Sequence, residues 1–339
     1  MQRVTLLAVT SLGFFATASC VAAQPVESFY RGRTVSILIG VGPGGGNDAW
    51  ARTVGKHIAG HIPGNPTIVP QNMPGAAGLK MTNYLYNAAP KDGTVFGLQT
   101  AGVLLEPQLG GEGVDFDPLK LNYIGSPDRD TTVCVARKDA SVQSMEQLMK
   151  EELVVGASGS GGNTNIFPLF FTNALNMKFK IIKGYKGTTD ILLAVERGEV
   201  SGMCSSFDPL QKQSVYKSGK LRILFQAAMA RDEKIDAPTP VSLIENDAQR
   251  DALAFFLARE QLGRPFVAPP GVPEERVQAL RRAFDATMKD PEFLSDAQKQ
   301  EFNVVAMTGE QIATLMGRIY QTPEDVVRLT AKALGREFK

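Results

Sequence analysis

The most constraining feature of this sequence is a regular alternation of short apolar runs with helical patterns. Runs rich in β-branched residues at 35–41, 67–71 and 95–99 predict strands, and the segments at 47–60 and 76–88 predict the helices between them. Such β-α-β-α order favours a mostly parallel sheet with helices on both faces. We therefore predict that the first part of the chain forms an α/β unit.

The same alternation starts again after residue 130. Further strands are predicted at 132–136, 153–157, 179–182, 200–204, 221–226 and 265–268. Further helices are predicted at 166–175, 188–197, 209–218, 274–289, 307–320 and 323–334. A chain of 339 residues is long enough for two domains. We expect one lobe from residues 24–130 with 227–339, and a second lobe from residues 131–226 inserted into it.

The N-terminus has the layout of a cleavable export signal. Arg3 precedes an apolar run at 4–18, and small residues lie before Gln24. Threonines and Ser11 interrupt the run, which makes a membrane anchor the weaker alternative because a spanning helix needs about 20 mostly apolar residues. We therefore expect a signal peptide at 1–23 and a periplasmic protein; lipid attachment at Cys20 is a lesser alternative.

Charge and cysteine content limit the partners. Removal of residues 1–23 takes away one basic residue and leaves 35 acidic residues balanced by as many basic ones. A net charge of zero gives no electrostatic reason to expect nucleic acid or an anionic membrane surface as a partner. Cys134 and Cys204 remain, and an oxidising compartment permits a disulfide between them, although two buried thiols fit the sequence equally well.

Four glycine-rich or turn-rich loops follow predicted strands and open predicted helices. They lie at 41–48, 71–78, 156–164 and 184–190. Such loops expose backbone N–H groups at the positive end of a helix dipole, where an anion is favoured. Because loops at the carboxyl ends of parallel strands share an edge of the sheet, we expect a common cleft with loops from both lobes.

Catalytic and cofactor motifs fit poorly. The first loop has Asn47 where a dinucleotide fingerprint needs its third glycine, and no Gly-Lys-Ser/Thr follows for a nucleotide-phosphate loop. The third loop has Ser160 where a nucleophile elbow needs glycine. His57 and His61 are spaced as a metal pair would be, but we expect helix-end surface histidines. No cofactor, metal site or catalytic residue is predicted.

An ordered set of short motifs resembles the substrate-binding receptors of tripartite tricarboxylate transporters, also called Bug receptors. The matching motifs are FYRGR at 29–33, GPGGGND at 42–48, NMPGAAG at 72–78, APKDGT at 89–94, YKG at 185–187, ERGEV at 196–200 and APPGVP at 268–273. The sequence departs from the commoner family pattern at Asn163, in a region where many relatives carry histidine, and at Cys204-Ser205-Ser206.

The resemblance implies a type II periplasmic binding fold, with two α/β lobes, a hinge and an interlobe cleft. It further implies a monomeric receptor that holds a small organic carboxylate and passes it to membrane permease subunits, with no catalysis. The implied ligand-binding residues are Gly44, Gly45, Gly46, Asn47, Asp48, Asn72, Gly75, Ala76, Ala77, Thr100, Ser158, Ser160, Gly161, Asn163, Thr164, Tyr185, Gly187, Thr188, Asp190 and Ser205. The alternatives are an enzyme acting on a small organic acid and a periplasmic sensor for a signalling partner.

Overall fold

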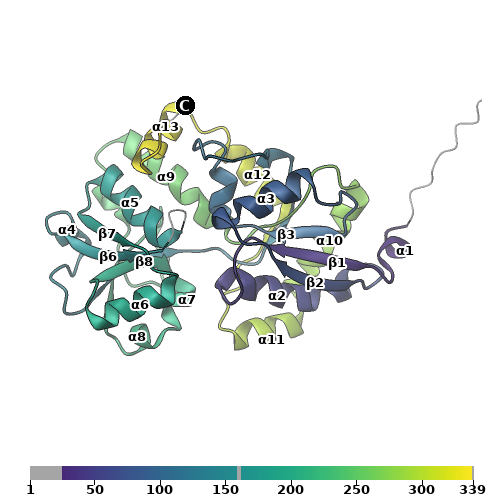
Figure 1. Ribbon diagram of the computed structural model, residues 1–339, viewed down its shortest axis with the longest axis horizontal. Coiled ribbons are helices and arrows are strands. Elements are labelled where there is room, and N and C mark those ends of the chain that lie inside the picture. The colour runs from purple at the N-terminus through teal and green to yellow at the C-terminus, as the bar shows by residue number, and fades with distance from the viewer. Residues whose placement is uncertain (1–24, 159–161, 338–339) are drawn as a thin grey trace, which may run out of the picture.

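The computed structural model describes residues 25–158 and 162–337, and it contains two α/β lobes side by side (Figure 1). The predicted signal peptide, Cys20 and the candidate site residues Ser160 and Gly161 lie outside the described residues. Within the described ranges, none of the helices has the length and apolar character needed to cross a membrane.

The first sheet has the strand order β11-β4-β10-β3-β1-β2. Its strands are β1 (Thr34–Ile39), β2 (Thr67–Asn72), β3 (Val95–Leu98), β4 (Asn122–Ser126), β10 (Phe266–Ala268) and β11 (Met307–Thr308). Strand β1 runs parallel to both β2 and β3, whereas β10 is antiparallel to β3 and β4. Strand β11 is antiparallel to β4.

The second sheet has the order β7-β6-β8-β5-β9. Its strands are β5 (Thr132–Arg137), β6 (Leu153–Ala157), β7 (Phe179–Lys183), β8 (Gly202–Ser206) and β9 (Leu221–Gln226). The expectation of mostly parallel sheets is wrong, since β5 is antiparallel to β8 and β9 here, as β10 is in the first sheet. The reason is connectivity: β5 and β10 each enter their sheet from the segments that join the lobes, against strands that point toward those segments.

Helices cover both sheets (Figure 1). Beside the first sheet lie α1 (Val26–Tyr30), α2 (Gly46–Ile58), α3 (Leu79–Asn87), α10 (Glu274–Thr287), α11 (Pro291–Lys299) and α12 (Gly309–Ile319). Beside the second lie α4 (Met145–Leu148), α5 (Asn163–Leu175), α6 (Thr188–Arg197), α7 (Phe207–Gln211) and α8 (Ser214–Lys217). Helix α13 (Glu324–Ala333) packs on α5 and on α9 (Asp247–Leu262). Short 3-10 turns are η1 (Ala59–His61), η2 (Ala76–Gly78), η3 (Ala101–Leu105), η4 (Pro118–Lys120) and η5 (Pro240–Leu243).

Some predicted helix bounds differ from the structure. Helix α5 begins at Asn163 rather than 166, so Pro168 falls in its second turn. The helix expected at 209–218 is divided into α7 and α8, and the segment at 307–320 begins with the short strand β11. Strand β4 and helices α4, α9 and α11 were not predicted. The lobe bounds of 24–130 with 227–339, and of 131–226, stay a prediction.

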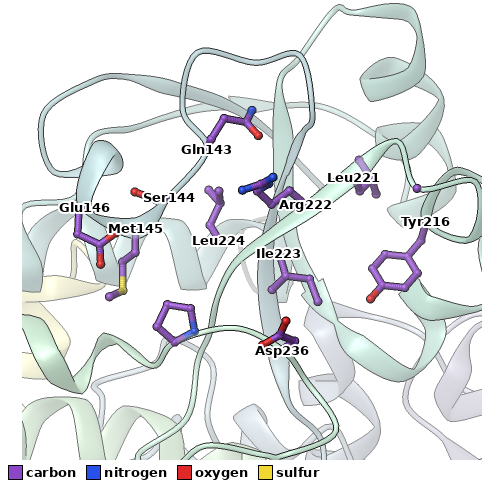
Figure 2. A pocket seen from close by; sticks show the side chains of 12 residues that line it. Gln143, Ser144, Met145, Glu146, Tyr216, Leu221, Arg222, Ile223, Leu224 and Asp236 are labelled. Carbon is purple, nitrogen blue, oxygen red and sulfur yellow. The ribbon is translucent and has the colours of Figure 1, made fainter.

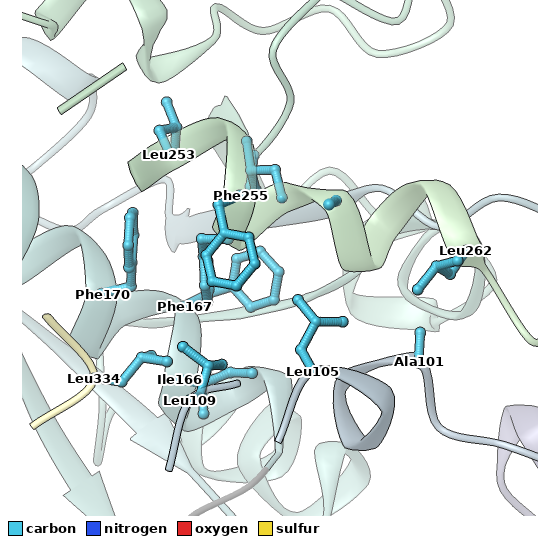
Figure 3. Packing of buried hydrophobic residues seen from close by; sticks show 14 of the residues in the cluster. Ala101, Leu105, Leu109, Ile166, Phe167, Phe170, Leu253, Phe255, Leu262 and Leu334 are labelled. Atoms are coloured by element: carbon cyan, nitrogen blue, oxygen red, sulfur yellow. The ribbon is translucent and has the colours of Figure 1, made fainter. Parts of the chain in front are cut away.

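A continuous hydrophobic cluster spans the two lobes on one side of the molecule. Leu105 of η3, Phe167 of α5 and Phe256 of α9 all belong to it and are almost fully buried. Phe170 and Phe256 stack with ring centroids 4.0 Å apart and planes 5° from parallel. Figure 3 shows side chains of η3, α5 and α9 meeting in this cluster. The lobes are therefore packed together along the α5–α9 side.

A disulfide crosses the second sheet. Cys134 of β5 pairs with Cys204 of β8 in the antiparallel ladder, and their sulfur atoms are bonded. Both residues are fully buried. Of the two states that the sequence left open, the structure contains the disulfide rather than the free thiols.

Candidate functional site

The carboxyl ends of strands from both sheets face the segments that join the lobes. In the first sheet, Phe266 at the start of β10 pairs with Leu98 at the end of β3, and the Gln99 N–H donates to the Pro265 carbonyl at 2.8 Å. In the second sheet, Thr132 at the start of β5 pairs with Ser206 at the end of β8. Strands β6 and β7 run parallel to β8 or to each other and so end at the same edge. The loops expected to bind ligand thus approach the junction from both sides.

The first two loops are held together by an ion pair and its hydrogen bonds. The Asp48 carboxylate, 5% exposed as a residue, accepts from the Gly44 N–H at 2.9 Å and from Arg52 Nε at 3.0 Å. Asn72 Nδ2 donates to the same carboxylate at 2.8 Å and to the Val41 carbonyl at 3.0 Å. Burial opposes ionisation, but these donors lower the pKa of Asp48 to about 2. Gly44, Asp48 and Asn72 therefore position the loops through contacts within the protein.

The end of β1 and the turn before α3 approach unusually closely. A Cβ atom added to Gly40 would lie 2.9 Å from the Cα of Gly78, which leaves room for glycine alone. Ala76 and Ala77 have positive φ angles of 44° and 55°. Non-glycine residues in this region store about 1–3 kcal/mol each, a feature that clusters at ligand sites.

Thr100 adds an unpaired polar atom at this place. Its hydroxyl is buried and has no hydrogen-bond partner among the described residues. A Cβ atom added to Gly78 would lie 3.3 Å from that hydroxyl oxygen. Since a buried hydroxyl without a partner costs free energy, Thr100 is a natural donor or acceptor for a ligand group.

In the second lobe, the structure brings three candidate residues together. The Ser158 N–H donates to Thr164 Oγ1 at 3.0 Å, and the two hydroxyl groups lie 2.9 Å apart. The Tyr185 N–H donates to the Ala157 carbonyl at 3.3 Å, which fixes its loop against the end of β6. Gly187, Thr188 and Asp190 begin α6 after the adjacent strand β7, and among the described residues none of the three makes a hydrogen bond or an ion pair with the other loops.

A buried arginine that the sequence reading missed lies at the junction. Arg264 is 7% exposed, its Nε donates to Asn47 Oδ1 at 3.0 Å, and its Nη1 pairs with Asp128. Its Nη2 lies 3.8 Å from Asp130 Oδ2, which also accepts from Ser206 Oγ at 2.5 Å. The candidate loop at Asn47 is thereby connected to the end of β8, next to the candidate residue Ser205.

Burial and neighbouring charges have opposite effects on the pKa values of the buried groups at the junction. Burial raises the pKa of Asp128 to about 7 even beside Arg264. Burial alone would lower the pKa of Arg264, but Asp128 and Asp130 raise it. We take Arg264 as the permanent charge of this pair, because a guanidinium group does not lose its proton in proteins.

A second connection at the junction involves Asn163. Its Nδ2 donates to Thr132 Oγ1 at 3.2 Å, and the Thr132 N–H donates to the Glu260 carboxylate at 2.6 Å. The Asp130 N–H donates to the Glu260 carbonyl at 3.1 Å. Burial, with a further contribution from Asp130, raises the pKa of Glu260 to about 8. Helix α9 thus holds Asp130 and Thr132 in place next to Asn163 of the third loop.

One cavity of about 480 Å³ lies between the lobes, next to β8. Phe207 and Asp208 of α7 line it together with Lys234 and the segment 301–304 after α11. Burial and the nearby Asp130 raise the pKa of Asp208. None of the candidate ligand-binding residues lines this cavity, although the lining residue Phe207 directly follows Ser206 in the sequence.

A larger cavity of about 680 Å³ lies in the second lobe, beside the edge strand β9 (Figure 2). Arg222 and Leu224 of β9, Gln143, Tyr216 and Asp236 are among its lining residues. It too contains none of the candidate residues. It therefore does not connect the loops of the two lobes.

The two histidines attach α11 to α2 and η1. His57 Nε2 lies 3.0 Å from Asp296 Oδ2, and His61 Nε2 lies 2.8 Å from Asp290 Oδ2. Each histidine thus has its own carboxylate. Over residues 25–158 and 162–337 no group of three or more His, Cys, Asp or Glu residues is arranged to hold a metal ion.

Comparison with known proteins places this architecture in a family. The family described as tripartite tricarboxylate transporter family receptor matches residues 51–328. A Cupriavidus necator protein, described as "UPF0065 protein in gbd 5'region", is 25% identical over 326 residues, which cover 92% of this chain and 93% of that protein.

Solved structures share the fold at lower identity. The periplasmic binding protein BugD is 22% identical with a TM-score of 0.68, and the match covers 91% of this chain and 100% of BugD. MatC from Rhodopseudomonas palustris, solved with bound malate, is 21% identical with a TM-score of 0.66 and coverage of 87% and 99%. R. palustris Rpa4515, solved with adipate, is 18% identical with a TM-score of 0.66 and coverage of 89% and 97%.

The two lobes have a type II periplasmic-binding-protein-like fold, as these neighbours do. The family match extends over most of the described chain and includes strands of both sheets. The chain therefore belongs to the tripartite tricarboxylate transporter receptor family, a family of solute-binding receptors.

Proposed function

We propose that this protein is an extracytoplasmic receptor that captures a small carboxylate between its lobes and delivers it to a tripartite membrane transporter. The observation that carries the proposal is the convergence of strand ends from both sheets on one junction. Loops after β1, β2 and β3 approach it from one lobe, and loops after β6, β7 and β8 approach it from the other. Family membership supports the same function, as do the two neighbouring structures that were solved with bound malate and with adipate.

The available polar groups can account for useful affinity. Hydrogen bonds to a charged group contribute about 1.5–3 kcal/mol each, so four of them approach the roughly 8 kcal/mol of a micromolar complex before ordering costs. The Thr100 hydroxyl is one unoccupied candidate, and the Ser158–Thr164 pair offers further hydroxyl groups. The Gly44 N–H is a weaker candidate than the sequence suggested, because Asp48 already accepts from it.

We expect ligand binding to bring the lobes together. Only a closed arrangement lets loops of both lobes contact one molecule, and closure about joining segments is a common response of such proteins. The shared cluster along α5 and α9 restricts this motion to the opposite side of the molecule, where α7 faces α11. The receptor would perform no chemistry on its ligand, because Asp128 and Asp130, the carboxylates beside the candidate residues Asn47 and Ser205, are already paired with Arg264.

Binding is tested by thermal unfolding with a panel of small acids: malate, adipate, citrate and benzoate. A ligand at 100 times its Kd stabilises the native state by about 2.7 kcal/mol, which raises the melting temperature. We expect at least one acid to do so, with calorimetric confirmation and compaction in small-angle scattering. No binding of any carboxylate in a broadened panel would overturn the proposal.

A matched pair of variants locates the site. Thr100→Val removes the unpaired hydroxyl near η2, whereas Thr172→Val removes a buried hydroxyl of α5 that also has no hydrogen-bond partner within the described part of the chain. We expect Thr100→Val to weaken binding of the active acid about tenfold, the equivalent of about 1.4 kcal/mol. Thr172→Val should leave the affinity unchanged; equal affinities for both variants would exclude Thr100 from the site.

The enzyme alternative has its own test. The acid identified in the thermal panel is incubated with the protein and then analysed by chromatography. Recovery of unchanged acid supports a receptor, whereas conversion to a product would favour an enzyme. Pull-down of permease subunits from membranes, with and without the acid, tests the delivery step.

A further inference from the structure

The joining segments come close together at Gly263, directly before Arg264. Gly263 has a φ of 58°, and a Cβ atom added there would lie 1.9 Å from the Asp128 carbonyl oxygen. This contact requires glycine, and it brings the backbone of Arg264 beside the segment that leaves β4. The Arg264 N–H donates to Ser126 Oγ at 3.0 Å, and that hydroxyl donates to the Asp128 carbonyl at 3.0 Å. The backbone of Arg264 is thus fixed at the crossing between the lobes.

The guanidinium group has partners on the joining segment and at the start of α2. It contacts Asp128 and Asp130 on the joining segment and Asn47 at the start of α2. Gly46 also lies against it, since a Cβ added to Gly46 would be 3.7 Å from Arg264 Nη2. With two carboxylates already beside it, Arg264 has little capacity to bind a third, anionic group directly.

The same contacts continue into the second lobe. Asp130 Oδ2 accepts a hydrogen bond from Ser206 Oγ at the end of β8. Asn47 and Ser206 are not hydrogen-bonded to each other, but Asn47 accepts from Arg264, Ser206 donates to Asp130, and Arg264 lies beside Asp130. The start of α2 and the end of β8 are therefore held in a fixed relation by a network of side chains that lies at the crossing itself.

We propose that Arg264 is a positioning residue that sets the 44–48 loop of the first lobe in register with the end of β8 in the second lobe, so that both present their donors to one ligand. This proposal rests on the proposed receptor function for its consequence in binding. Its structural content, the coupling of the two loops, does not depend on any ligand. Arginine suits the role because its planar fork reaches several acceptors at fixed angles, whereas lysine offers a single point charge.

The coupling is tested in the ligand-free protein by hydrogen exchange. We expect Arg264→Lys, which keeps the charge, to raise exchange about tenfold in two separate places, the 44–48 loop and residues 205–207. The matched control is Arg276→Lys. Arg276 is a half-buried arginine of the first lobe; it donates to the Asp92 carbonyl and lies over the Phe29 ring, away from the junction. The control should change neither segment.

Two smaller substitutions keep the test decisive if Arg264→Lys folds poorly. Asn47→Ala should raise exchange at residues 205–207, and Ser206→Ala should raise exchange in the 44–48 loop, because coupling between two sites is reciprocal. Reciprocal effects support the proposal even without the Arg264 variant. Variants that affect only their own segment, in a protein that remains folded, would overturn it.

The consequence for binding is measured separately, with malate and adipate as probes. We expect Arg264→Lys to weaken binding of the active acid about tenfold, and Asn47→Ala with Ser206→Ala to weaken it by less than the product of the single effects. The role of Arg264 is contradicted if the effects of Asn47→Ala and Ser206→Ala on binding are additive and each variant changes hydrogen exchange only in its own segment. If the unmodified protein binds no carboxylate, the receptor function fails while the exchange result stands on its own.

Discussion

Cys134 of β5 lies directly opposite Cys204 of β8, and the disulfide between them joins two strands that are 70 residues apart in sequence. The chain between the two cysteines includes β6, β7, α5 and α6. A bond that closes so long a loop lowers the entropy of the unfolded chain, with a stabilisation on the order of 4 kcal/mol.

We expect the double variant Cys134→Ala/Cys204→Ala to lose about 4 kcal/mol of unfolding free energy and so to unfold at a lower denaturant concentration. Denaturant unfolding monitored by circular dichroism measures the loss. Reductant serves as the control: it should destabilise the unmodified protein to a similar degree and have no effect on the double variant. An unmodified protein equally stable with and without reductant, both states being checked by thiol titration, would show that the disulfide adds no stability.

The Asp48 carboxylate should make stability depend on pH in the acid range. Its pKa is about 2 in the folded protein, below the ordinary value of 3.8. The unfolded chain therefore binds the proton more tightly, so this contribution is complete above about pH 4 and is lost as the pH falls toward 2. Asp48→Asn should reduce the free energy of unfolding at pH 7 by about 1.5–3 kcal/mol, as expected for the loss of hydrogen bonds to a charged group.

Urea unfolding at several pH values between 2 and 5 measures this effect. Asp251→Asn is the control, since Asp251 is exposed on α9 and has no side-chain hydrogen bond or ion pair to any described residue. The slope of stability against pH should flatten in Asp48→Asn and stay unchanged in Asp251→Asn. Identical slopes in the two variants would mean that Asp48 titrates normally.

Because Gly40 lies in close contact with Gly78, we expect an alanine substitution to destabilise the protein at Gly40 but not at Gly42. Alanine at position 40 would place its Cβ 2.9 Å from the Gly78 backbone and 3.2 Å from Met81, whereas alanine at position 42 would meet nothing within 4 Å. We expect Gly40→Ala to cost about 1–3 kcal/mol of stability, as overpacking does, and to displace the 76–78 turn. Gly42→Ala should be nearly neutral, and thermal unfolding of both variants checks the contrast.

Much of the fold could be predicted from local patterns. Strands β6 and β9 and helix α6 have the predicted bounds, because both strands are short runs rich in β-branched and apolar residues and the helix is an amphipathic stripe that ends at Gly198. Helix α9 was missed for the opposite reason. It is buried on most sides, Arg259 and Glu260 included, and so shows no single apolar stripe.

Only part of the candidate site could be predicted from local sequence patterns. Glycine-rich turns after strands identify the loops, since that signal is local. The junction could not be found in this way, because Arg264 lies 136 residues from Asp128 and 217 from Asn47. A charged residue between Gly263 and Pro265, directly before a buried strand, was the one local sign of it.

The contact between α7–α8 and the turn after α11 should influence how far the lobes open. Lys212 donates to the Gln300 carbonyl and lies 4.8 Å from the Phe302 ring centroid. Lys217 lies 3.6 Å from Glu301, and Lys234 donates to Asn303 at 3.3 Å. These contacts join the lobes on the side opposite the α5–α9 cluster, so opening must break them.

We expect Lys212→Met/Lys217→Met to favour the open form in the absence of ligand. Exposed pairs contribute about 0.2–1 kcal/mol each, so the ratio of open to closed molecules should rise about fivefold, with a larger radius of gyration in small-angle scattering. Lys180→Met is the control, because its ion pair with Glu152 at 3.5 Å lies within the second lobe. At 1 M salt the Debye length is about 3 Å, so the attraction within such pairs is largely screened. High salt should therefore expand the unmodified protein in the same way, and the double variant hardly at all. An unmodified protein whose dimensions do not respond to salt or to the lysine substitutions would show that these contacts do not restrain the lobes.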